Sequence, residues 1–217
     1  MSNTVFIYTD GTTSESNHTI LTKSSYTNPI TKYLKSVIVG TSCSSLGQDC
    51  FRDMHLISIT IPNSVTSLGT NCFYQSTNLT SITIPDSVTF LGEHCFRGCT
   101  KLTSIVITNF LANISNSCFQ GCSSLTSILI PNTVKSLGNN CFTDCTSLSS
   151  IIYANPSGIT SAGVTPFLNT PSMKVNFFLT PLVPSTPSGV YTTSLYTSGT
   201  TFNYISISFM NLYLFYL

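Results

Sequence analysis

The stretch that decides the fold is residues 79–85, LTSITIP, because the chain returns to it at a constant spacing. Residues 56–62 read LISITIP, and residues 125–131 read LTSILIP. The leucines that head these stretches belong to a series spaced by 23 residues, and Leu34 lies 22 residues before it: Leu56, Leu79, Leu102, Leu125 and Leu148. Self-similarity at a fixed period of roughly 20–50 residues indicates stacked repeats that share one core.

Each repeat continues in the same order after its leucine. An aliphatic residue follows twelve positions later, usually with Gly after it, and a Cys-Phe pair begins four positions further on. The pairs are Cys50-Phe51, Cys72-Phe73, Cys95-Phe96, Cys118-Phe119 and Cys141-Phe142. A sixth repeat, from Leu148, is degraded, because Pro166-Phe167 comes two residues late and Met173 takes the next leucine position.

The repeat predicts its own local structure. In residues 79–84 the apolar side chains alternate with Ser and Thr, which is typical of a strand with one buried face. Pro85-Asp86 ends that strand, and residues 87–91 are expected to form a second, short extended piece. We expect the Cys-Phe segment to form about one turn of helix. The sequence therefore predicts a β-rich leucine-rich-repeat solenoid of about six turns of 22–25 residues.

The repeat resembles that of the BspA-like family of leucine-rich repeats, which reads approximately L-T-S-I-x-I-P-x-S-V-T-x-I-G-x-x-A-F-x-x-C. The resemblance covers residues 34–172, and the chain departs from it by having Cys before Phe in the well-matched repeats. Members of that family occur on bacterial surfaces, in parasitic protists and in large DNA viruses, typically as adhesion or surface proteins. The resemblance implies no enzyme activity, and it identifies no binding residue because the motif residues are structural.

The flanks of the repeat region differ from it in composition. Residues 1–33 are polar and are expected to cap the open end of the solenoid, residues 34–172. Residues 173–189 are Pro-rich and predict a stiff linker. Residues 190–217 form an apolar, aromatic tail in which 190–196 and 201–209 have the pattern of a hairpin.

The low content of charge excludes several classes of function. Charged residues make up 7% of the chain, against a typical value of about 25%, and the formal net charge is +1. Binding nucleic acid through a basic field needs clustered cations, so no nucleic-acid partner is expected. The acids Asp86, Glu93 and Asp144 are scattered among the repeats. We therefore predict no enzyme, no catalytic residue and no cofactor.

The chain has nine cysteines, which could be packed thiols, disulfides or metal ligands, and their positions in the repeat favour the first of these. The cysteines of the Cys-Phe pairs form one ladder, and Cys99, Cys122 and Cys145 form a second, four residues downstream. Cys43 takes a position that is Val in other repeats, so we expect packed thiols that behave as small apolar groups. Disulfides between neighbouring repeats and a zinc site are the less favoured alternatives, because parallel Cβ vectors oppose a bridge and only His94 lies near a C-x₃-C pair. No metal site is predicted.

The residues at the two ends of the chain are the ones that could direct the protein to a compartment or a membrane. The first residues lack the basic stretch of a signal peptide, and free thiols fit synthesis in a reducing compartment. Display on a cell or virion surface remains an open alternative. Residues 202–217 are uncharged, but a helix of that length spans about 24 Å, short of the ~30 Å hydrocarbon core. A membrane tail is therefore the less favoured interpretation.

The outward positions of the strands provide the candidate binding face. One column is Ser in every repeat, and its neighbour changes from Thr to aliphatic residues along the chain. The candidate residues are Ser81, Thr83, Ser104, Val106, Ser127, Leu129, Ser150 and Ile152. The leading hypothesis is a non-enzymatic adhesion or binding module whose face contacts a protein or a glycan. The alternatives are a structural component that assembles with itself in a virion or surface layer, and an ordinary sheet surface without a partner.

Overall fold

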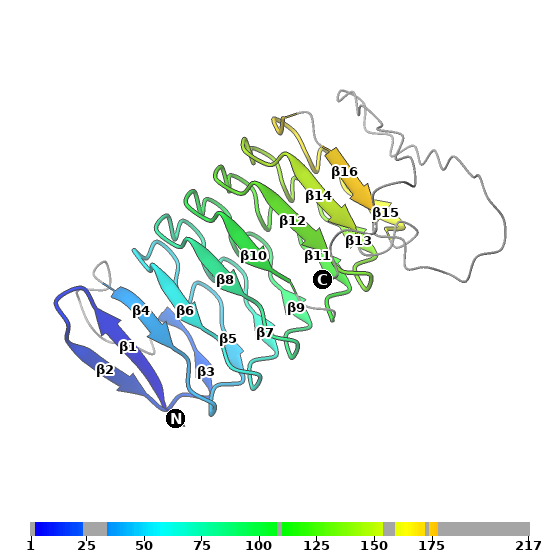
Figure 1. Ribbon diagram of the computed structural model, residues 1–217. Coiled ribbons are helices and arrows are strands. Elements are labelled where there is room, and N and C mark those ends of the chain that lie inside the picture. The colour runs from blue at the N-terminus through cyan, green and yellow to red at the C-terminus, as the bar shows by residue number, and fades with distance from the viewer. Residues whose placement is uncertain (1–2, 24–33, 108–109, 154–158, 172–173, 178–217) are drawn as a thin grey trace, which may run out of the picture.

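The computed structural model describes residues 3–23, 34–107, 110–153, 159–171 and the backbone of 174–177. These residues form an elongated solenoid in which each repeat is one turn stacked on the next (Figure 1). The predicted leucine-rich-repeat solenoid is thereby confirmed. Residues 178–217, which include the predicted hairpin and most of the predicted linker, lie outside the described residues.

One long ladder of strands forms the front wall of the solenoid, and we call its outward surface the strand face (Figure 1). From β4 to β16, strands that pair are parallel and in register, so that Ser36 pairs with Ser58, Ser81 with Ser104, and Ser127 with Ser150. Backbone pairing is interrupted between β6 and β8 and between β10 and β12, which still lie side by side. The strands are β4 (Leu34–Ile38), β6 (Ser58–Thr60), β8 (Ser81–Thr83), β10 (Ser104–Val106), β12 (Ser127–Ile130), β14 (Ser150–Tyr153) and β16 (Lys174–Phe177).

A second ladder of two-residue strands forms another wall behind the first (Figure 1). It begins before the well-matched repeats, because Leu21 pairs in parallel with Leu46. It is interrupted once in the described residues, between β9 and β11. The strands are β3 (Ile20–Leu21), β5 (Ser45–Leu46), β7 (Ser67–Leu68), β9 (Phe90–Leu91), β11 (Asn113–Ile114), β13 (Ser136–Leu137) and β15 (Ser161–Ala162).

The N-terminal end of the front ladder is closed by a hairpin. β1 (Thr4–Tyr8) runs antiparallel to β4, and β2 (Thr13–Ser16) runs antiparallel to β1. Phe6 is fully buried, and the hydroxyl of Thr4 accepts a hydrogen bond from the N–H of Gly40 at 3.0 Å. β1 therefore covers the first end of the core with its own apolar face.

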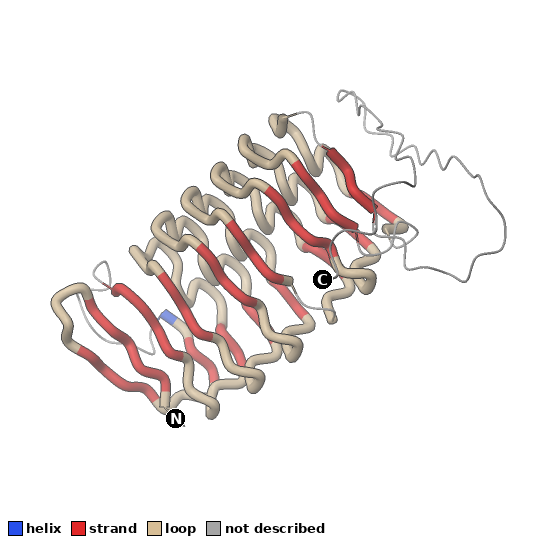
Figure 2. Tube along the Cα trace, in the orientation of Figure 1, coloured by secondary structure: helices blue, strands red, loops and turns tan. Residues whose placement is uncertain are grey.

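The helical turn predicted for the Cys-Phe segment is wrong. Asn71 and Gln75, which flank Cys72-Phe73, have φ of 56° and 57°, and left-handed residues four apart stop an α-helix from forming. The N–H of Phe73 instead donates to the carbonyl of Cys95 in the next repeat, at 2.8 Å. The segment is a tight turn that bonds its neighbours as a strand would, and Figure 2 draws it as loop. We call this side of the solenoid the turn edge.

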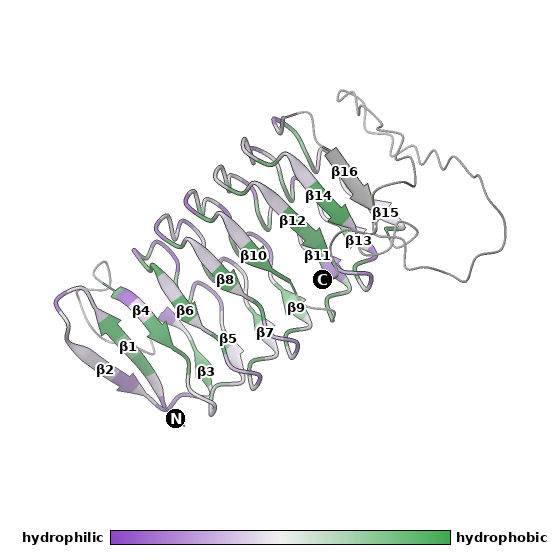
Figure 3. Cartoon of the chain, in the orientation of Figure 1, coloured by the Kyte–Doolittle hydropathy of each residue, from purple (hydrophilic) through white to green (hydrophobic). Residues whose placement is uncertain are grey.

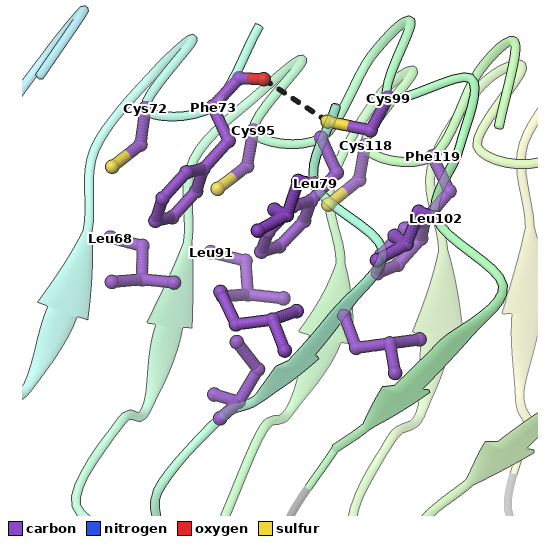
Figure 4. Packing of buried hydrophobic residues seen from close by; sticks show 14 of the residues in the cluster. Leu68, Cys72, Phe73, Leu79, Leu91, Cys95, Cys99, Leu102, Cys118 and Phe119 are labelled. Carbon is purple, nitrogen blue, oxygen red and sulfur yellow. Dashed lines mark hydrogen bonds between the residues drawn. The ribbon is translucent and has the colours of Figure 1, made fainter. Parts of the chain in front are cut away.

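Stacked phenylalanines form the centre of the core beneath the turn edge. Successive rings from Phe51 to Phe142 lie 5.1–5.4 Å apart between centroids, and all are fully buried. Phe167 continues the stack at 5.5 Å from Phe142, so the degraded repeat keeps its core residue despite its late position. Leu79 and Leu102 from the strand side pack around this stack (Figure 4).

The prediction that the cysteines pack in the core is confirmed, because each of the nine is buried. The second ladder does more than fill space. The thiol of Cys99 donates to the carbonyl of Phe73 at 3.1 Å (Figure 4). In the next two repeats, Cys122 donates to the carbonyl of Phe96 and Cys145 to that of Phe119. Ser76 occupies the same position and donates to Phe51 at 2.7 Å. This ladder therefore supplies hydrogen-bond donors to buried carbonyls.

The glycine after each aliphatic residue allows neighbouring repeats to approach closely. A Cβ on Gly92 would lie 2.3 Å from the backbone N of Thr70, and the Gly92 N–H donates to Leu68 at 2.8 Å. The fourth repeat has Ser115 here, and its hydroxyl, instead of an N–H, donates to the carbonyl of Leu91 at 2.5 Å. Ser115 thus carries a Cβ at a position that is Gly in other repeats, and β9 and β11 do not pair here.

Candidate binding face

The predicted site residues all lie on four consecutive strands of the front ladder, β8, β10, β12 and β14. The register brings Thr83 beside Val106 and Leu129 beside Ile152. The side chains on β8, β10 and β12 are exposed, and Ser150 and Ile152 on β14 are half-buried. Residues of separate repeats thus lie side by side on one surface. The backbone hydrogen bonding of the strands is interrupted once on this surface, between β10 and β12.

An apolar column runs along part of this surface. Val106 and Leu129 are 53% and 43% exposed and lie on consecutive strands of the front ladder. Ile38 extends the same column at the N-terminal end, with Thr60 and Thr83 between. Figure 3 shows the apolar colour on β10, β12 and β14, as well as on β1 and β4. The face therefore joins a Ser column to an aliphatic column.

The sequence reasoning missed a third outward column that borders the Ser column. It consists of Thr80, Thr103, Thr126 and Ser149, which are exposed. The hydroxyl of Thr103 donates to the carbonyl of Thr80 at 3.1 Å, and Ser149 donates to Thr126 at 3.3 Å. The signal was present, since each of these residues follows the repeat leucine directly. Within β6 to β14 the outward positions carry no charged side chain.

The turn edge has a different chemistry from the strand face. Arg52 contacts Asp49 at 3.1 Å and Asp53 at 3.3 Å, and its guanidinium lies 4.8 Å from the centre of the Tyr74 ring. Arg97 lies on the same ring at 5.8 Å. Partial burial alone would raise the pKa of Asp49, but hydrogen bonds from Arg52 and Asn71 outweigh it and lower that pKa. Arg52 and its two carboxylate partners are thus paired within the chain.

Amide side chains add a further ladder on the turn edge. Asn116 donates to the carboxylate of Glu93 at 2.9 Å, and its own amide oxygen accepts from the N–H of Asn139 at 2.9 Å. Asn139 in turn accepts from the N–H of Val164 at 2.7 Å. These bonds tie successive repeats together, so the polar groups of this edge are occupied in holding the stack.

The cysteines are buried, and the neighbouring His94 lies partly exposed. Burial raises the pKa of Cys122 well above its usual range and that of Cys145 to about 12, so these thiols stay protonated near neutrality. His94 is partly exposed in a left-handed conformation, and the adjacent Cys95 is buried. Among the described residues, no three His, Cys, Asp or Glu side chains gather where a metal ion could be held. Nor does that part of the chain contain a helix long and apolar enough to cross a membrane.

Comparison with known proteins agrees with this geometry. The family described as "BspA type Leucine rich repeat region (6 copies)" matches residues 5–89 and 66–183. A search of curated proteins gave no match.

Solved structures similar to this chain are leucine-rich repeat proteins from bacteria. The protein from Treponema pallidum is 24% identical, with a TM-score of 0.56 over 62% of this chain and 75% of that one. One from Eubacterium ventriosum is 22% identical, with a TM-score of 0.59 over 82% of this chain and 52% of that one. One from Bacteroides ovatus is 20% identical, with a TM-score of 0.53 over 76% and 48%. At these identities the likeness shows the fold, and the chain spans about half the length of the last two proteins.

Proposed function

Because this chain belongs to the BspA-type leucine-rich-repeat family, we propose that it is a non-enzymatic binding module of the adhesion type. Its strand face contacts a protein or a glycan, and its setting is the surface of a cell or a virion. Nucleic acid is not a partner, since the charge on this chain is too low to neutralise phosphates.

One observation supports this proposal above the others: the contrast in side chains between the strand face and the turn edge. The strand face has hydroxyl and aliphatic groups at its outward positions, and Val106 and Leu129 lie exposed on consecutive strands. Contiguous exposed apolar surface rimmed by polar groups marks interaction sites. Small Ser side chains beside it let a partner approach the backbone closely.

The experiment is a binding comparison between two matched substitutions. Leu129→Lys changes an apolar residue of the strand face that is 43% exposed, and Leu168→Lys changes one of the turn edge that is 42% exposed. The purified full chain and both variants are applied to an array of glycans and extracellular-matrix proteins. We expect Leu129→Lys to weaken any wild-type binding at least tenfold and Leu168→Lys to leave it unchanged.

Two results would contradict the proposal. Equal binding by both variants would show that the partner lies on another surface. Binding of the wild-type chain to no probe on the array, together with a monomeric state in solution, would leave the strand face as ordinary sheet surface.

The second candidate function is a structural component that assembles with copies of itself, in a virion or a surface layer. The exposed aliphatic column and the low charge favour it, because weak charge repulsion permits association. Size-exclusion chromatography with light scattering separates the two functions. Oligomers that Leu129→Lys dissociates would support self-assembly through the strand face, and a monodisperse monomer would disfavour it.

A further inference from the structure

The Ser column of the strand face consists of exposed side chains that the fold leaves without hydrogen bonds. The serines whose hydroxyls have no hydrogen-bond partner among the described residues are Ser58, Ser81, Ser104 and Ser127. The adjacent column differs, because the hydroxyl of Thr103 donates to the carbonyl of Thr80. A Ser hydroxyl can donate one hydrogen bond and accept two, so the Ser column offers donors and acceptors to a ligand.

These hydroxyls repeat once per strand along the solenoid. Ser81 pairs with Ser104 in register, on strands that lie about 4.8 Å apart. β6, β8, β10 and β12 follow one another side by side along the front wall (Figure 1). A ligand that uses several of these hydroxyls therefore has to be an extended chain that crosses the strands and has polar groups along its whole length.

The aliphatic column lies two residues further along the same strands. Val106 and Leu129 are exposed there, beside Ser104 and Ser127. A sugar ring has the matching chemistry, since it carries hydroxyls at its rim and an apolar face of C–H groups. The pairing of a hydroxyl column with an apolar column therefore suits a chain of sugar rings.

Charge and area narrow the choice of partner further. The outward positions from β6 to β14 carry no charged side chain, so an anionic or cationic chain would lose water there without gaining a counter-charge. From β6 to β14 this strip is about 19 Å long, and from Thr80 to Thr83 it is about 10 Å wide. Its area of about 200 Å², even if doubled for the relief of the side chains, is about half of the ~800 Å² that each partner buries in a stable protein–protein interface.

We propose that the partner of the strand face is a neutral, linear polysaccharide that lies along the ladder, across the strands. Its hydroxyls bond to the Ser column and the C–H faces of its rings contact Val106 and Leu129. This assignment rests on the proposed function and names the partner class for the same surface.

The experiment is titration calorimetry on the full chain with linear oligosaccharides from the disaccharide to the hexasaccharide. The neutral probes are β-1,4-glucan, β-1,3-glucan, β-1,4-mannan and chitin oligosaccharides, and heparin and alginate oligosaccharides are the charged controls. We expect at least one neutral series to bind, with affinity rising about tenfold or more from disaccharide to hexasaccharide, because a longer chain reaches more strands. The charged controls should not bind.

A matched pair of double variants locates the site. Ser104→Ala with Ser127→Ala removes two hydroxyls of the strand face and should weaken hexasaccharide binding about tenfold or more, with an unchanged melting temperature. Thr89→Ala with Ser161→Ala removes two exposed hydroxyls of the second wall and should leave binding unchanged.

Several outcomes would overturn the proposal. These are binding of no neutral series, stronger binding of heparin or alginate, affinity already complete at the disaccharide, or equal losses in the two double variants. If no neutral series binds but a matrix protein does, and Leu129→Lys abolishes that binding, the partner is a protein and the proposed function stands. If the matrix proteins do not bind either, the proposed function fails as well.

Discussion

The strand face and the turn edge are built by the same stacking, yet they use their side chains differently. On the turn edge, Arg52 and Glu93 contact neighbours in the chain, and left-handed turns direct every second N–H to the next repeat. On the strand face the outward side chains are Ser, Thr and aliphatic residues, with exposed Val106 and Leu129. Side chains join neighbouring repeats on both surfaces, through amides and Glu93 on the turn edge and through the hydroxyls of Thr103 and Ser149 on the strand face. The difference in outward side chains is the reason that we propose the strand face as the surface that contacts a partner.

Alkaline pH should have the largest effect, and it acts on the turn-edge side, where both thiol ladders lie. Burial raises the pKa of Cys72, Cys118, Cys122 and Cys145, so the folded chain keeps these protons while the unfolded chain releases them above about pH 8.5. The unfolded state then binds fewer protons, so the free energy of unfolding falls as pH rises. Each thiol contributes a loss of about 1.4 kcal/mol per pH unit above that pH.

Urea unfolding from pH 7 to pH 10 measures this loss, with a reducing agent present. The free energy of unfolding should be constant from pH 7 to about pH 8.5 and should fall steeply above that pH. A flat profile up to pH 10 would mean that the thiols are not buried as described.

Phe96→Ala should cost about 3–5 kcal/mol, as for other buried aromatic residues. Phe96 is fully buried and stacks on Phe73 and Phe119, so neighbouring repeats should loosen as well. Phe90→Ala, at a Phe on the second wall that is 48% exposed, is the matched control and should change stability by about 0.5 kcal/mol or less. Thermal unfolding of both variants checks the pair, and similar melting temperatures would mean that the core is misassigned.

Gly92→Ala should destabilise by about 1–3 kcal/mol, because its Cβ would lie 2.3 Å from the backbone of the preceding repeat. Gly47→Ala is the control, since its Cβ would come no nearer than 3.0 Å to Thr22. We expect the second variant to lose clearly less stability in chemical denaturation. The reverse order would contradict close approach as the reason for glycine at this position.

Cys122→Ala should cost about 1 kcal/mol, since it removes the donor to the carbonyl of Phe96. Cys122→Ser should retain most of the stability, because Ser76 already serves as the donor in another repeat. If urea unfolding showed equal losses of stability for the Ala and the Ser variants, the thiol would act by its size and not as a hydrogen-bond donor.

Most of the fold could be predicted from the repeat. The features that were missed depend on the local backbone conformation of single residues. The alternation in residues 79–84 and the spacing of the Cys-Phe pairs placed the strands and the core correctly, because both depend on periodicity. The turns at Asn71 and Gln75 were missed, because an isolated Cys-Phe pattern does not distinguish a helical turn from a left-handed one. Gly98 and Gly121, at the position of Gln75, were the available signal.

The donor role of the second thiol ladder was missed for another reason. Cys99 contacts the carbonyl of Phe73 in the preceding repeat, and a contact across repeats is not visible in one repeat alone. Ser76 at the equivalent position pointed to a hydrogen bond rather than an apolar role. The outward columns of the strand face were placed by the period of two, and binding by them remains a prediction.

The measurement that tests the central claim most directly is stability and binding measured together on Leu129→Lys and Arg52→Ala. Arg52→Ala removes two half-exposed ion pairs and the contact with Tyr74, so it should lower the melting temperature slightly and leave binding intact. Leu129→Lys should keep the melting temperature within about 1 °C and abolish binding to the array or self-association. A Leu129→Lys variant that unfolds, or an Arg52→Ala variant that loses binding while staying folded, would contradict the division between a binding strand face and a structural turn edge.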